Sequence, residues 1–190
     1  LEDATRLAES LVGTGKARGK KIVALITDME EPLGRMVGNF LEIEESMDVL
    51  EGAGPADVTE LTLAFAAWMI VLGGKAKGFD EGRTLAEEAV KSGRAMELFM
   101  ENVTLQGGDA AKLLADRGKR RSAHHAEFRA RSDGFIETID AFKTGLAGVY
   151  LGVGRNRTEE AVCPEAGMII RKRKGDAVKK GDLIMDIYGK

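Results

Sequence analysis

Three acidic residues follow a loop rich in proline and glycine, and they are the side chains in this sequence best placed to bind a ligand. The loop runs from residue 28 to residue 39 and contains Pro32, Leu33 and Gly34, and the acids are Glu42, Glu44 and Glu45. Acidic residues in the first turn of a helix interact favourably with the helix dipole. One interpretation is therefore that these acids begin a short helix over 46–50. The alternative is a cation site, because loop carbonyl groups and a carboxylate are the oxygen ligands that a hard cation prefers.

A second glycine-rich stretch lies near the start of the sequence. Gly13-Thr14-Gly15-Lys16 has the composition of a phosphate loop, but a phosphate loop follows a strand, opens a helix and carries Ser or Thr after its Lys. Here a helix predicted over 2–12 precedes the stretch, and Ala17 follows Lys16. We therefore interpret it as a linker from helix to strand.

His124, His125 and Cys163 are the remaining candidates for catalysis or metal binding. Neighbouring residues in a strand point to opposite faces, so the two histidines are poorly placed to share one metal ion. Cys163 lies near Glu160 and Glu165, and nearby acids raise the pKa of a thiol, which opposes nucleophilic reactivity. A pairing of Cys163 with either histidine stays open as an alternative.

Composition excludes several classes of protein. The 190 residues are 44% hydrophobic and 31% charged, which suits a globular domain with a core. A formal net charge of −3 argues against a nucleic-acid-binding or anionic-membrane surface. The longest apolar stretch, 61–72, is too short to span a bilayer, and no signal peptide is visible. A single cysteine allows no internal disulfide, so we expect a cytoplasmic protein.

Periodicity predicts alternating elements along the chain. The run Ile22–Thr27 is almost wholly apolar and rich in β-branched residues, which predicts a strand buried on both faces. Ligands bind beyond the carboxyl ends of such strands in open α/β sheets, which is where the loop 28–39 lies. Helical spacing follows over 55–73, 80–91, 94–105, 110–117 and 141–151, and strands are predicted over 128–131, 134–139, 168–171 and 183–188.

Three runs resemble the pyrimidine-nucleoside phosphorylases, a family that includes thymidine phosphorylase. They are TDMEEPLGRMVGNFLEIEE over 27–45, LGVGR over 151–155, and the segment from AGMI at 166–169 through GDAVKKG at 175–181. The resemblance covers essentially the whole sequence in order. The family's phosphate-binding segment and its catalytic Arg, Ser and Lys lie upstream of the part matched, so we expect a C-terminal fragment with no catalytic residue and no cofactor-binding residue.

The resemblance implies an α/β (α+β) fold. Residues 1–118 are expected to form the C-terminal part of a mixed-sheet α/β domain with packed helices. Residues 119–190 are expected to form a hammerhead or barrel-sandwich-like α+β domain, truncated at its end. The implied parent enzyme is a pentosyltransferase, a homodimer that acts on a pyrimidine nucleoside and phosphate, with no nucleic-acid or membrane partner. The implied cofactor is K⁺, bound by the backbone oxygens of Leu33 and Met36 and the carboxylate of Glu45, with further ligands from the upstream loop.

The alternative function is a non-catalytic binding or carrier module. The end of the sequence has the strand–turn–strand pattern shared with biotinyl and lipoyl carriers, and Lys190 is the only candidate for the modified lysine. Lys190 is preceded by Tyr188-Gly189, where carriers have Met or Ala beside the lysine, and it falls about one residue short of the expected spacing.

Overall fold

The computed structural model describes every residue from Leu1 to Lys190. It contains seven helices and two antiparallel sheets, which confirms the α+β class. The chain forms two compact units, which are described separately below: Leu1–Asp28 with Glu60–Ala89, and Met29–Thr59 with Val90–Lys190. The domain boundary predicted between residues 118 and 119 stays a prediction.

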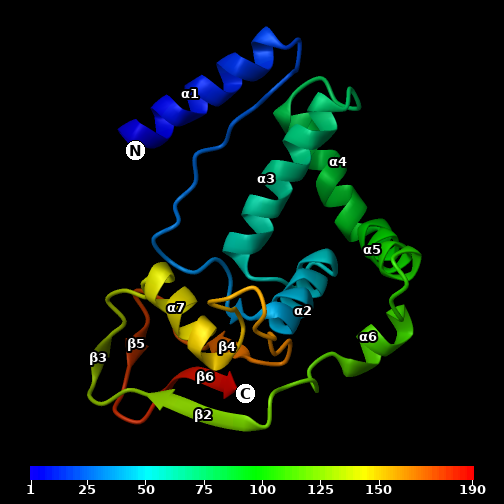
Figure 1. The fold of residues 1–190 in the computed structure, drawn as a ribbon. Helices are drawn as coiled ribbons and strands as arrows, with labels where there is room; N and C mark the ends of the chain where they lie inside the picture. The colour runs from blue at the N-terminus through cyan, green and yellow to red at the C-terminus, as the bar shows by residue number, and fades with distance from the viewer. The chain divides into compact units, whose positions relative to one another are not determined.

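The first unit is helical, with α1 (Glu2–Ala17) and most of α3 (Ala56–Leu72) and α4 (Phe79–Lys91) (Figure 1). The predicted end of the first helix at residue 12 is wrong, because α1 continues to Ala17. Trp68 is half-buried and its ring lies 5.4 Å from that of Phe79. None of the helices is long and apolar enough to cross a membrane.

The strand predicted over Ile22–Thr27 is wrong: the segment has no regular secondary structure and belongs to no sheet, and Ile26 is 47% exposed. A strand is stable only when neighbouring strands satisfy its N–H and C=O groups. The six strands of this chain pair only with one another, so this segment has no such neighbour. Residues 22–27 thus have the apolar pattern of a strand, but no strand of this chain pairs with them.

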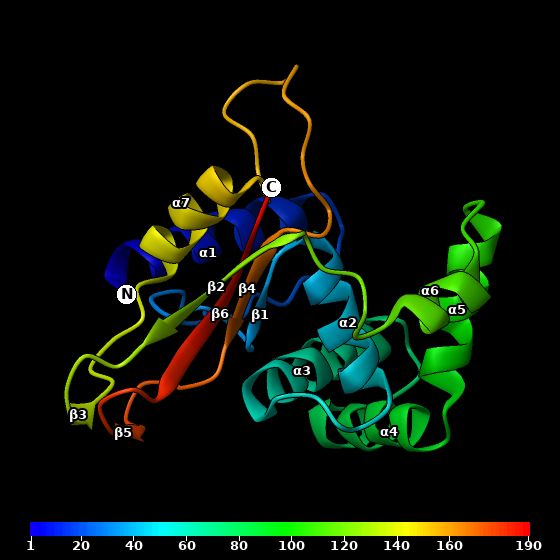
Figure 2. The same cartoon turned by 90° about the horizontal axis from the view of Figure 1, so that it is seen from below.

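The second unit is organised around an antiparallel sheet in the order β1 (Met36–Val37), β4 (Gly167–Ile170), β6 (Leu183–Gly189) and β2 (His124–Arg129) (Figure 2). A two-stranded sheet pairs β3 (Gly134–Phe135) with β5 (Ala177–Val178). All four residues of β4 are buried, whereas β2 at the edge is exposed along its length. Val37 of β1 pairs with Met168 of β4, so the loop that precedes β1 is joined to the C-terminal part of the chain.

Four helices complete the second unit: α2 (Asn39–Leu50), α5 (Arg94–Leu105), α6 (Ala110–Asp116) and α7 (Ala141–Leu151). The predicted bounds of α5 and α7 are confirmed, and Asp109 caps α6 by accepting from the Lys112 N–H at 2.8 Å. The core includes Leu41 and Met47 of α2, which lies against β1 and β4. The helix predicted to begin at residue 46 begins at Asn39, so the three acids lie inside it.

Candidate functional site

The loop before α2 has a conformation that two glycines allow. Gly34 has φ +73°, and a Cβ there would overlap the carboxylate of Glu45. Gly38 has φ +144°, and a Cβ there would lie 2.9 Å from the Cα of Gly167. Residues with a side chain rarely adopt these φ values. Glycine at both positions therefore lets the loop approach α2 on one side and β4 on the other.

The three acids of α2 have different surroundings. Glu42 accepts from the Gly38 N–H at 3.1 Å and so caps the start of its own helix. Glu44 is buried and pairs with Arg121, with 2.6 Å between Oε2 and Nη2. Glu45 is also buried, but it turns towards the loop. Glu44 therefore serves the fold, whereas Glu42 and Glu45 lie on the side of α2 that faces the loop.

The carboxylate of Glu45 is held by the backbone of the loop. Its Oε1 accepts from the Arg35 N–H at 2.7 Å. Burial raises the pKa of Glu45, the N–H groups of Arg35 and Met36 oppose that rise, and the negative charges of Asp57 and Asp48 add to it. A buried carboxylate near two other acids is a site that a cation would stabilise.

The peptide groups of β1 show which way the Met36 carbonyl points. In an antiparallel ladder, hydrogen-bonded and non-bonded pairs alternate. The Ile170 N–H donates to the Arg35 carbonyl at 2.7 Å, and Met36 is paired with Ile169 one position along. Met36 is therefore in a non-bonded pair, and because β1 is an edge strand its carbonyl points away from the sheet and accepts no ladder bond.

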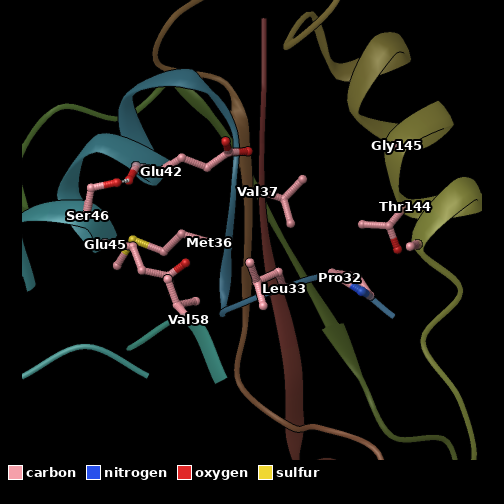
Figure 3. Close-up of a pocket in the computed structure, with 11 residues that line it drawn as sticks. Pro32, Leu33, Met36, Val37, Glu42, Glu45, Ser46, Val58, Thr144 and Gly145 are labelled. Atoms are coloured by element: carbon pink, nitrogen blue, oxygen red, sulfur yellow. Dashed lines mark hydrogen bonds between the residues drawn. The ribbon is translucent and has the colours of Figure 1, made fainter. Parts of the chain in front are cut away.

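A pocket of about 370 Å³ adjoins these groups (Figure 3). Leu33, Met36 and Glu45 all line it, so the structure brings the three predicted ligand residues to one cavity. Thr144 and Gly145 of α7 lie on the other side of the pocket (Figure 3). The predicted donor set, two backbone carbonyls and one carboxylate, is of the kind that a hard monovalent or divalent cation takes and suits neither zinc nor copper.

Two charged residues at this loop were not expected from the sequence. Asp57, in the first turn of α3, accepts from the Gly34 N–H at 3.0 Å. Arg173, in the loop after β4, donates to the Gly34 carbonyl and to Asp57, the latter at 2.9 Å. These contacts join residues up to 139 apart in the chain, and no local pattern could have indicated them.

The other predicted candidates lie apart from the loop. His125 Nε2 donates to Asp186 Oδ1 at 2.9 Å and its ring stacks on Tyr188, and His124 is exposed on β2. The Cys163 thiol lies 3.7 Å from a Glu165 oxygen, so its partner is an acid and not a histidine.

The structure places the two candidate lysines, Lys16 and Lys190, within or next to regular secondary structure. Lys16 lies inside α1, where the backbone cannot cradle a phosphate. Lys190 follows β6, and its N–H donates to the Leu151 carbonyl at 3.1 Å.

Comparisons with known proteins match the chain along most of its length. Residues 1–96 match the glycosyl transferase family, a/b domain, and residues 135–190 match the pyrimidine nucleoside phosphorylase C-terminal domain. The chain is 40% identical over 189 residues to a pyrimidine-nucleoside phosphorylase of Geobacillus stearothermophilus. It is 37% identical to one of Staphylococcus haemolyticus and 36% identical to one of Staphylococcus aureus. In each case 99% of this chain is aligned, but it spans only 43% of the relative's length.

Proposed function

This chain belongs to the pyrimidine-nucleoside phosphorylase family, and from that premise we propose that it is the C-terminal part of an enzyme that cleaves pyrimidine nucleosides with phosphate. In this reaction a phosphate oxygen bonds to the anomeric carbon while the glycosidic C–N bond breaks. The base leaves with the electron pair and takes up a proton, and pentose 1-phosphate is the other product. The observation that carries the proposal is the ordered match of 99% of the chain to relatives of that name.

We propose that the contribution of this chain is support and not direct contact with the reacting atoms. Leu33 and Met36 would offer carbonyl oxygens, and Glu45 its carboxylate, to a K⁺ ion whose other ligands come from the rest of the full-length protein. Bound there, the ion would supply positive charge that balances the buried carboxylate of Glu45. It would also hold the loop against the segment of the full-length protein that provides the other ligands. The pocket and the raised pKa of Glu45, caused first by burial, support this assignment.

The unpaired segment Ile22–Thr27 supports a larger assembly. It is apolar and rich in β-branched residues, yet no strand of this chain pairs with it. We propose that it becomes a strand of the α/β domain when the rest of the full-length protein is present. Hydrogen exchange tests this: its amides should exchange slowly in the full-length protein and fast in the isolated 190 residues. Fast exchange in both would contradict the assignment.

Phosphorolysis by the full-length protein tests the function. Uridine or thymidine with phosphate should yield free base in a preparation free of host phosphorylase. The isolated chain should yield none, because it supplies no group that the family resemblance assigns to phosphate or base. Turnover by the isolated chain would show that this division of labour is wrong.

Assembly and location follow the family. We propose a homodimeric, cytoplasmic enzyme with no nucleic-acid or membrane partner, and sedimentation of the full-length protein tests the dimer. The carrier alternative requires a modifiable lysine at a hairpin tip. No contact of Lys190 favours that function: its backbone N–H donates to the Leu151 carbonyl.

A further inference from the structure

We propose that Asp57 and Arg173 are a positioning pair that sets the direction of the loop carbonyls at the cation site, an inference that rests on the proposed function. Both residues contact the backbone of Gly34 and also contact each other. Neither is one of the proposed ligands, so each would act through the loop.

Asp57 orients the peptide group between Leu33 and Gly34. In a trans peptide the C=O of one residue and the N–H of the next point in opposite directions within one plane. The Gly34 N–H donates to Asp57 Oδ2 at 3.0 Å. The position of Asp57 therefore sets the direction of the Leu33 carbonyl, which is a proposed cation ligand.

The next peptide group, between Gly34 and Arg35, is held at both its N–H and its carbonyl. The Arg35 N–H donates to Glu45 Oε1 at 2.7 Å, and the Gly34 carbonyl on the other side of that peptide accepts from Arg173. Arg173 Nη2 also donates to Asp57 Oδ2 at 2.9 Å, which closes a ring of contacts around Gly34. Any rotation of either peptide would break a bond to a charged side chain, and such bonds are about twice as strong as neutral ones.

The pair is itself firmly held. Burial alone would raise the pKa of Asp57, but bonds from the N–H groups of Gly34 and Val58 and the charge of Arg173 outweigh it and lower the pKa, so Asp57 is ionised near neutral pH. The Arg173 N–H donates to Asp176 at 2.7 Å, which fixes the backbone from which the guanidinium extends. Their side chains are 38% and 24% exposed, so solvent only partly screens the pair.

This arrangement gives the C-terminal region a role at the site. Arg173 belongs to the region that matches the C-terminal domain of the family, whereas Leu33 and Glu45 belong to the region that matches the a/b domain. The contact between Arg173 and Gly34 would thus make the direction of the ligand carbonyls in the a/b region depend on the position of the C-terminal region.

The test is a K⁺ titration of the full-length protein at constant ionic strength, with choline chloride replacing KCl. The melting temperature is the primary readout, because it needs no turnover, and phosphorolysis is the second. Arg173→Met removes both contacts of the guanidinium while keeping an unbranched apolar stem. It should raise the K⁺ concentration for half-maximal stabilisation by about tenfold or more, the usual effect of losing a partner that orients a metal ligand. Arg173→Lys should give an intermediate value.

Arg120→Met is the matched control. Arg120 pairs with Glu165 at similar exposure, 40% and 29%, but touches no part of the loop. It should lower the melting temperature without changing the half-saturating K⁺ concentration. Should Arg173→Met fail to fold, Asp57→Asn gives an independent measurement, since Asn keeps an acceptor for Gly34 and removes the charge that holds Arg173. Its half-saturating K⁺ concentration must exceed that of the control.

The outcomes separate this inference from the proposal beneath it. If the wild-type protein responds to K⁺ and both loop variants match Arg120→Met, the positioning role is refuted while the cation site stands. If the wild-type melting temperature and turnover ignore K⁺, the cation site fails and the positioning role fails with it. Phosphorolysis, measured in the same preparation, would show separately whether the full-length protein has the activity proposed for it.

Discussion

The buried ion pair between Glu44 and Arg121 gives the sharpest stability prediction. Their side chains are 3% and 17% exposed, and Glu44 accepts from Arg121 at 2.6 and 3.0 Å and from the Gly118 N–H at 2.7 Å. Arg121→Ala would leave a buried carboxylate with no balancing charge. Removing one partner of such a pair typically costs about 3–5 kcal/mol, and we expect a loss in that range.

Urea unfolding of the 190-residue chain, followed by far-UV circular dichroism, measures this loss. The exposed pair Arg94–Glu97, at 58% and 66% exposure, provides the control, and Arg94→Ala should cost under about 1 kcal/mol. The double variant Glu44→Leu/Arg121→Met should recover most of the stability, because two apolar groups leave no buried charge. A loss below about 1 kcal/mol for Arg121→Ala, or no recovery in the double variant, would show that the charge of Glu44 does not need Arg121 to balance it.

Three further predictions concern single residues. Trp68→Ala should destabilise the chain by about 2–3 kcal/mol in a denaturant melt, less than the roughly 3–5 of a fully buried Trp because Trp68 is half-buried, and a shift under about 0.5 kcal/mol would place it on the surface. Gly34→Ala should cost more stability than Gly107→Ala, since both have positive φ but only Gly34 has no space for a Cβ, and equal thermal shifts would contradict this. The pKa of Asp186 is lowered, since bonds from its histidine and arginine partners outweigh its burial. Its contribution should therefore be complete above about pH 4 and be lost as the pH falls through the lower folded-state pKa, and Asp186→Asn should flatten this acid limb of the stability curve.

The helices could be predicted from the sequence because their signals are local. The bounds of α5 and α7 follow from apolar spacing and from breakers at Gly93 and Gly152, both of which have positive φ in the structure. The segment 22–27 could not, because a strand depends on partners that no local pattern reveals. The same apolar pattern is compatible with a sheet that this chain alone does not complete.

The candidate site was predictable only in part. The sequence indicated an acid beside a glycine loop, and the family resemblance selected Glu45. The structure explains why the acids differ, because α2 begins at Asn39 and turns about 100° per residue. Glu44 therefore lies on a different face from Glu42. Arg173 could not be predicted, since its contact with Gly34 depends on the fold of the whole second unit.

Product analysis of the full-length protein shows whether it cleaves nucleosides with phosphate or with water. Uridine or thymidine is incubated with phosphate, and ³¹P NMR follows inorganic phosphate while chromatography follows the base. We predict that phosphate disappears as pentose 1-phosphate and free base appear in equal amounts, and that no base forms when phosphate is omitted. Base release that is independent of phosphate, with free pentose as the co-product, would show hydrolysis and contradict the account.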